Sequence, residues 1–121
     1  MSAVYVLFIC KRYGRYESPD STILYGDKPE LEIYGVYSSK KRAKKNIDDA
    51  LAKKLQRELY YLHEINWQLV SCEVKENAPE SKYKGFEIDV VEHGVDTETF
   101  EPKNFKYNIS WHCYIRRYVV D

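Results

Sequence analysis

The chain has 121 residues and balances 19 basic against 19 acidic side chains, so its formal net charge at pH 7 is zero. This length suits a single domain over residues 1–121, and the neutral balance removes the simplest reason for attraction to nucleic acid or a membrane. No apolar run reaches the roughly 18 residues of a membrane span. Three cysteines without a CxxC pair, and a start without a basic n-region, predict a cytoplasmic protein with reduced thiols.

The charges are unevenly distributed along the chain. Residues 1–60 hold 12 basic and 8 acidic groups, whereas residues 61–121 hold 7 basic and 11 acidic groups. A dipolar molecule of this kind can meet an acidic partner at one end and a basic partner at the other, or associate with itself head-to-tail. Ordinary solvated surfaces explain the same pattern.

Two strands are expected before the first helix. The apolar, β-rich run at residues 4–10 predicts a central strand, and residues 31–37 predict a second one. Between them, residues 11–28 contain Gly14, Pro19 and Gly26 and are typical of a long loop or irregular hairpin, with a short extended piece near residues 22–25.

A long amphipathic helix is expected from about residue 40 to about residue 65. Ser38 or Ser39 is the expected N-cap, because a serine hydroxyl accepts a hydrogen bond from the first turn, and Asn66 ends the helix. One apolar stripe at spacings of three and four predicts the face that packs on the sheet: Ala43, Ile47, Ala50, Leu51, Leu55, Leu59 and Leu62. The helix is longer than one small sheet needs, which leaves its last turns free to meet a second subunit.

Three further strands are expected at residues 67–74, 85–92 and 105–120, separated by polar loops. The order β-β-α-β-β-β predicts an α+β fold: a mostly antiparallel sheet of about five strands with the helix packed on one face. The other face is expected to be partly open and to carry Tyr5, Tyr114, Arg116 and Tyr118, drawn from a chain that holds 12 tyrosines.

Three segments resemble a family of small uncharacterised proteins from bacteria and their phages. They are VYVL at residues 4–7, GVYSSKKRA at residues 35–43 and the closing strand at residues 111–121, together about a fifth of the chain. The family pattern is a VYVL-like strand and then G-V-[FY]-S-S-x-x-x-A opening a helix. The chain departs from it in the insertion at residues 11–28 and in its extra strands. The resemblance implies a fold and no activity, and its phage connection suggests an accessory role such as modulating a host protein.

Few residues point to catalysis or to a metal. The histidines His63, His93 and His112 are isolated, and the three cysteines lie in apolar strands, where cysteine usually behaves as a small buried hydrophobe. The sequence contains no GxGxxG, no P-loop and no calcium loop. We therefore expect no enzyme activity and no cofactor.

Two functions remain as hypotheses. The first is a protein-interaction module that binds and inhibits another protein through Tyr5, Tyr114, Arg116 and Tyr118, with a homodimer as a further expectation. The alternative is a phosphate, nucleotide or nucleic-acid binder at the start of the helix, where Lys40, Lys41, Lys44 and Lys45 face a helix end that is already positive. Lysines at a helix end also serve simply as a solvated surface.

Overall fold

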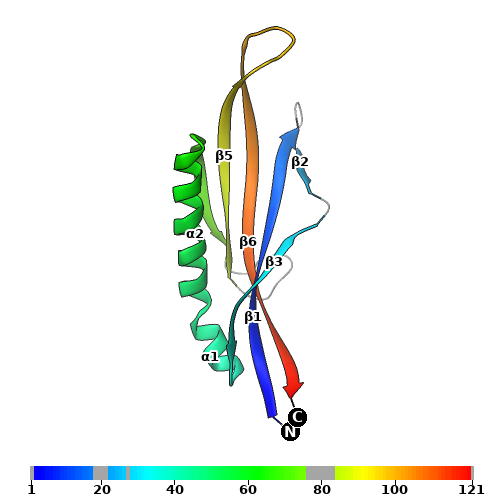
Figure 1. Ribbon diagram of the computed structural model, residues 1–121, viewed down its shortest axis with the longest axis vertical. Helices are drawn as coiled ribbons and strands as arrows, with labels where there is room; N and C mark the ends of the chain where they lie inside the picture. Colours follow the sequence, from blue (N-terminus) through cyan, green and yellow to red (C-terminus); the bar gives the residue numbers. More distant parts are fainter. Residues whose placement is uncertain (1, 18–21, 27, 76–83, 121) are drawn as a thin grey trace.

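The structure is a computed structural model that describes residues 2–17, 22–26, 28–75 and 84–120. In these residues it contains six strands and two helices, shown in Figure 1: β1 (Ser2–Glu17), β2 (Thr22–Tyr25), β3 (Glu30–Tyr37), α1 (Lys40–Lys45), α2 (Ile47–Glu64), β4 (Gln68–Lys75), β5 (Gly85–Val95) and β6 (Pro102–Val120).

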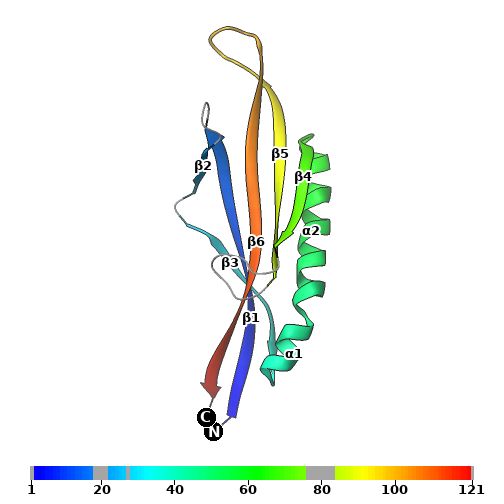
Figure 2. The same cartoon turned by 180° about the vertical axis from the view of Figure 1, so that it is seen from behind.

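The strands form one antiparallel sheet in the order β2-β1-β6-β5-β4, and β3 also pairs with β1. One edge of β1 pairs with β6. The other edge of β1 pairs with two strands in turn: β3 lies beside residues 5–11, and β2 lies beside residues 14–17. Both helices lie on one side of the sheet, as Figures 1 and 2 show. The predicted α+β class, an antiparallel sheet with a long helical segment on one face, is confirmed.

The first strand is longer than the sequence indicates. Residues 11–17, expected in a long loop or irregular hairpin, continue β1, and their pairs with β6 include Lys11 with Trp111 and Gly14 with Asn108. The hairpin alternative and the short extended piece near residues 22–25 are confirmed, because β2 pairs antiparallel with residues 14–17 of β1. The physical reason is that β6 is 19 residues long and offers a hydrogen-bonding partner along almost all of β1. The parts of the expected loops at residues 18–21 and 76–83 lie outside the described residues.

The single predicted helix is divided at Asn46. Ser39 is the N-cap of α1, and its hydroxyl accepts a hydrogen bond from the backbone N–H of Arg42 at 3.2 Å. Asn46 interrupts the helix and donates its side-chain amide to the carbonyl of Arg42 at 2.9 Å. The second helix then opens with Asp48 and Asp49, which suit the positive helix N-terminus.

The expected end of the helix at Asn66 is confirmed. Asn66 adopts a left-handed φ of 60°, and the N–H of Trp67 bonds to the carbonyl of Leu62 at 3.0 Å. This is the closing pattern of a Schellman motif, in which asparagine tolerates the left-handed conformation better than most residues do.

The core lies between the helices and the sheet face that they cover. Leu7, Ile88 and Val90 are fully buried there, and Phe86 stacks on Trp111 with ring centroids 4.5 Å apart. Complete burial of one such aliphatic side chain contributes about 1.5–3 kcal/mol. Most of the predicted apolar stripe contributes to this layer, with buried members Ala43, Ile47, Ala50, Leu51 and Leu62.

The molecule is elongated, and its two ends differ. At one end the β5–β6 hairpin projects beyond the rest of the sheet, and at the other end α1 lies near the ends of β1 and β6 (Figures 1 and 2). The sheet and its core therefore separate the hairpin from α1 along the long axis.

Candidate functional site

The strand register decides which residues share a face of the sheet. Leu7 faces the helices and lies opposite Ile115, whereas the neighbouring pairs Val6–Arg116 and Phe8–Tyr114 point to the other side. Tyr118, which pairs with Val4, also lies on that side. Three of the four predicted partner-binding residues, Tyr114, Arg116 and Tyr118, are thus brought together.

Tyr5 does not join them. It pairs with Arg117 of β6 and with Tyr37 of β3, and it has the same parity along β1 as Leu7. Because side chains alternate along a strand, Tyr5 lies on the face that carries the helices. The prediction that it shares a face with Tyr114, Arg116 and Tyr118 is therefore wrong.

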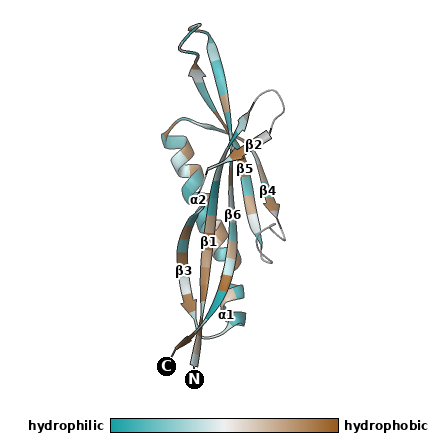
Figure 3. Cartoon of the chain, turned by 90° about the vertical axis from the view of Figure 1, so that its right-hand side faces the viewer, coloured by the Kyte–Doolittle hydropathy of each residue, from teal (hydrophilic) through white to brown (hydrophobic). Residues whose placement is uncertain are grey.

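The third strand adds exposed apolar residues to the side away from the helices. Leu31, Ile33 and Val36 pair with Cys10, Phe8 and Val6, and each is 55–60 % exposed. We call this surface the open face: the exposed Leu31, Ile33, Val36, Arg116 and Tyr118, the half-buried Tyr114, and the buried Val6, Phe8 and Cys10 of the strand between them. Hydrophobic stretches of β1 and β3 are visible side by side in Figure 3, with the helices behind the sheet.

Sequence reasoning missed the contribution of β3 to this face. The alternate spacing of Leu31 and Ile33 is typical of a strand. The pairing of β3 with β1 is irregular, however: Gly35 pairs with Leu7 and Ile33 pairs with the next residue, Phe8, so one residue of β3 is left over between them. The irregularity puts Val36 on the same side as Ile33, although the two are three positions apart.

The aromatic and basic groups of β6 are positioned by their neighbours. The guanidinium of Arg116 lies over the Phe8 ring, 5.9 Å from its centroid. The Tyr114 hydroxyl is 3.0 Å from Nε2 of His112, a residue that is almost completely buried. Tyr118 is 45 % exposed. The open face thus offers partly exposed aliphatic groups, a tyrosine and one cation, the combination that protein interfaces favour.

A polar cluster occupies the same side of the sheet further along the strands. Asp89 of β5 accepts hydrogen bonds from the Tyr16 hydroxyl at 2.6 Å, the Asn108 amide at 2.9 Å and the Ser71 hydroxyl at 3.1 Å. Burial acts to raise the pKa of Asp89, but these donors outweigh it and hold the pKa below its ordinary value. Burial, followed by the bond to Asp89, raises the pKa of Tyr16. Asp89 therefore serves to join the strands.

The lysines of α1 gather around one hollow. Lys40, Lys41, Lys44 and Lys45 are exposed and line a shallow depression of about 470 Å³, here called the lysine hollow. The first turn of α1 contains no acidic residue. Because α1 packs against β1, β3 and β6 on the helix-bearing face, Arg117, which the register places on that face, adds to the positive charge of this end. The structure thus places the four predicted anion-binding residues together.

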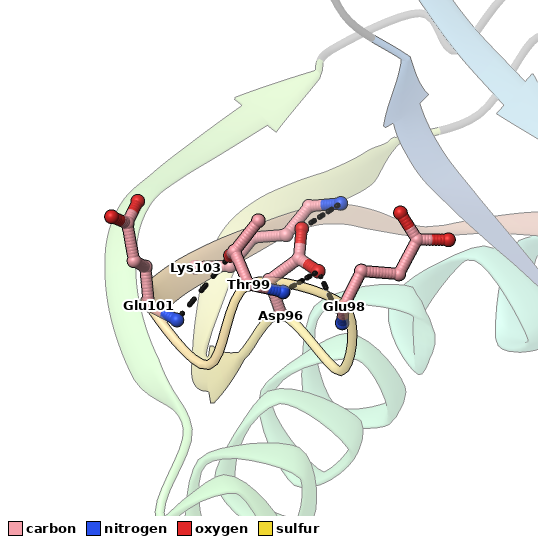
Figure 4. Close-up of polar contacts among 5 residues, drawn as sticks. All are labelled: Asp96, Glu98, Thr99, Glu101 and Lys103. Atoms are coloured by element: carbon pink, nitrogen blue, oxygen red, sulfur yellow. Dashed lines mark hydrogen bonds and ion pairs between the residues drawn. The ribbon is translucent and has the colours of Figure 1, made fainter.

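The tip of the β5–β6 hairpin is held by Asp96. Its carboxylate accepts hydrogen bonds from the backbone N–H groups of Glu98 at 2.8 Å and Thr99 at 3.3 Å, as Figure 4 shows. These two bonds hold the pKa of Asp96 below its ordinary value. Asp96 also bonds through its backbone to Phe100 and Glu101 at 2.8 and 2.9 Å.

Phe100 is the unusual residue of this turn. It has a left-handed φ of 59°, a conformation that favours glycine, and its side chain is 81 % exposed. The segment DTETF does not predict the left-handed conformation, since Gly or Asn is the residue that normally indicates such a position in a turn. It does not predict the exposure of Phe100 either.

A further depression with charged walls lies between β3 and α2. It measures about 380 Å³ and is lined by Ile9, Lys11, Glu30, Leu31, Glu32, Lys54, Arg57, Glu58 and Trp111. Lys11 pairs with Glu58 at 3.5 Å and Lys54 pairs with Glu32, so much of its charge is neutralised internally.

The cysteines differ in their surroundings. Cys10 and Cys113 are buried, and burial raises the pKa of Cys113 to about 12. Cys72 is exposed on β4, contrary to the expectation that all three cysteines are buried.

Within residues 2–17, 22–26, 28–75 and 84–120, no group of three histidine, cysteine or carboxylate side chains could hold a metal ion. None of the helices there has the length and apolar character needed to cross a membrane.

Comparison with protein-family models, curated proteins and solved structures found no match to the chain. The candidate sites therefore stand on their own geometry.

Proposed function

We propose that the chain is a non-enzymatic interaction module that binds another protein through its open face. The observation that carries the proposal is a row of exposed aliphatic residues on β3, with Arg116 and Tyr118 of β6 exposed on the same side of the sheet across β1. Exposed apolar side chains accompanied by tyrosine and arginine are typical of sites that bind proteins.

The energy available from this surface suits a protein contact. Complete burial of one large aliphatic side chain gives about 1.5–3 kcal/mol, and Leu31, Ile33 and Val36 are each already near half burial. Tyrosine and arginine at the centre of an interface commonly account for a large share of its affinity. The partner we expect has an apolar patch with a carboxylate placed to meet Arg116.

The resemblance to small phage and bacterial proteins supports a more specific role. In this role the chain acts in the cytoplasm of the host cell as an accessory protein and inhibits its partner by covering a surface that the partner needs. A homodimer formed through the open face would compete with the same contact.

The test is affinity capture from cells in which the chain is naturally made, followed by mass spectrometry, with and without nuclease. We expect a protein that is retained after nuclease treatment and that is depleted by Arg116→Ala and Tyr118→Ala. Because both side chains are exposed, these variants should keep the wild-type circular dichroism spectrum. Retention that is identical for wild type and both variants would exclude the open face as the binding surface.

The lysine hollow supports a second candidate function. Four lysines around one depression could bind a phosphate, a nucleotide or a nucleic acid. This function predicts binding that weakens steeply with salt and is lost on Lys41→Glu/Lys44→Glu. A flat salt response, or binding that survives the charge reversal, would exclude it.

A further inference from the structure

The hairpin tip combines two features that cost free energy where they stand. A large aromatic side chain occupies the left-handed position of Phe100, and that side chain is 81 % exposed to solvent. The turn does not need it, because Asp96 already satisfies the backbone N–H groups of Glu98, Thr99 and Phe100. Unfavourable local choices that persist in a chain commonly mark a functional site.

The tip is also acidic. Between residues 92 and 103 the chain has four carboxylates, Glu92, Asp96, Glu98 and Glu101, against one lysine, Lys103. Lys103 pairs with Asp96 at 3.9 Å, while Glu98 and Glu101 are both exposed and extend from opposite sides of the turn (Figure 4). Phe100 lies between Glu98 and Glu101 in the sequence. The tip therefore presents an apolar group flanked by negative charge.

The lysine hollow has the opposite character. Lysine side chains offer aliphatic stems at their base and ammonium groups at their ends, so a depression lined by four of them has apolar walls and a basic rim. The six residues of α1 include five basic ones and no acidic one. An aromatic ring flanked by carboxylates is the complementary ligand.

We infer that the hairpin tip of one copy docks into the lysine hollow of a second copy, with Phe100 against the lysine stems and Glu98 and Glu101 against the ammonium groups. The two surfaces lie at opposite ends of the elongated molecule (Figure 1), so a chain cannot satisfy its own hollow. The contact joins different surfaces of the two copies. It does not use the open face and therefore goes beyond the proposed function.

The first test is sedimentation velocity of the purified chain over a wide concentration range, at about 20 mM and about 500 mM salt. We expect concentration-dependent assembly at low salt that is lost at high salt, because the contact is largely electrostatic. Phe100→Gly and Lys41→Glu/Lys44→Glu should each be monomeric. The melting temperature of Phe100→Gly should be no lower than that of wild type, because glycine relieves the backbone strain. A monomeric Phe100→Gly with an unchanged or higher melting temperature has therefore lost docking and not folding.

Mixing the two variants makes the test specific. Phe100→Gly keeps an intact hollow and Lys41→Glu/Lys44→Glu keeps an intact tip, so an equimolar mixture should form pairs and stop at two copies. Lys28→Glu/Arg57→Glu, which changes the net charge equally but away from α1, should assemble like wild type. Wild type that stays monomeric at low salt, or a mixture that stays monomeric, would overturn the inference.

Zero-length carbodiimide crosslinking between ¹⁵N-labelled and unlabelled copies gives a direct readout. We expect mixed-isotope crosslinks that join Glu98 or Glu101 to the α1 lysines. Intermolecular crosslinks that omit these pairs would overturn the inference. A loss of self-association on Phe100→Gly with unchanged capture of another protein would separate this contact from the proposed function.

Discussion

Asp89 links residues from strands that lie far apart in the sequence. Its carboxylate accepts hydrogen bonds from Tyr16 of β1, Ser71 of β4 and Asn108 of β6, while Asp89 itself belongs to β5. Asn108 is almost completely buried, so removal of the Asp89 carboxylate leaves the side-chain amide of Asn108 without this hydrogen-bond acceptor. A carboxylate in this position connects the sheet across four strands.

We predict that Asp89→Ala lowers the free energy of unfolding by about 2–4 kcal/mol, because hydrogen bonds to a charged group are worth more than neutral ones and a buried donor is left unpaired. Urea denaturation followed by circular dichroism measures this loss. Glu64→Ala, at an exposed carboxylate near the end of α2, should change stability by no more than about 0.5 kcal/mol. Equal effects of the two substitutions would contradict the structural role of Asp89.

The pH dependence follows from the lowered pKa of Asp89. A carboxyl group whose pKa is lower in the folded than in the unfolded protein adds stability above its unfolded pKa, and this stability is lost as the pH falls through the folded pKa. We therefore expect the stability difference between wild type and Asp89→Ala to be full at neutral pH and to shrink below about pH 4. A difference that is constant down to about pH 2 would show that the charge of Asp89 is not involved.

At the scale of elements, the helical segment was the most predictable part and the length of the first strand the least. The three- and four-residue spacing of apolar residues located the core face of α2, and Asn66 marked its end. The continuation of β1 through residues 11–17 could not be predicted, because Lys11, Arg12, Gly14 and Arg15 carry no apolar alternation, and their pairing is imposed by β6. Long-range partners override local propensity in this way.

The candidate site was predictable only in part, for the same kind of reason. The alternation along β6 placed Tyr114, Arg116 and Tyr118 together, but the side of Tyr5 depends on its register with β6. The left-handed conformation of Phe100 depends on the turn geometry set by Asp96, which a sequence without glycine or asparagine at that position conceals.

The helix offers a matched pair of leucines for a stability test. Leu51 is 6 % exposed and belongs to the core, whereas Leu59 is 37 % exposed. We predict that Leu51→Ala costs about 2–4 kcal/mol of unfolding free energy and Leu59→Ala less than about 1 kcal/mol, because only the first creates a cavity. Chemical denaturation of both variants checks this, and a larger loss for Leu59→Ala would contradict the packing described for α2.

At the scale of the whole molecule, the sheet separates α1 from the tip of the β5–β6 hairpin and leaves one face without a helix (Figures 1 and 3). The two ends carry opposite charge, since α1 has five basic residues and the hairpin tip has four carboxylates against one lysine. The basic groups of α1 account for the positive net charge of residues 1–60, and the acidic groups of the hairpin account for most of the negative net charge of residues 61–121. The open face lies on the side of the sheet opposite the helices and carries the exposed apolar residues of β3. The molecule therefore presents three surfaces of different character: the open face, the lysine hollow and the hairpin tip.

The most direct measurement of the central claim is the affinity of the captured partner for wild type, Ile33→Ser and Val70→Ser, by isothermal titration calorimetry. Ile33 and Val70 are 60 % and 54 % exposed, but only Ile33 belongs to the open face. If the open face binds the partner, Ile33→Ser should weaken the affinity about tenfold or more, which corresponds to about 1.4 kcal/mol, and Val70→Ser should leave it unchanged. Equal affinity for all three proteins, or a greater loss for Val70→Ser, would contradict the claim.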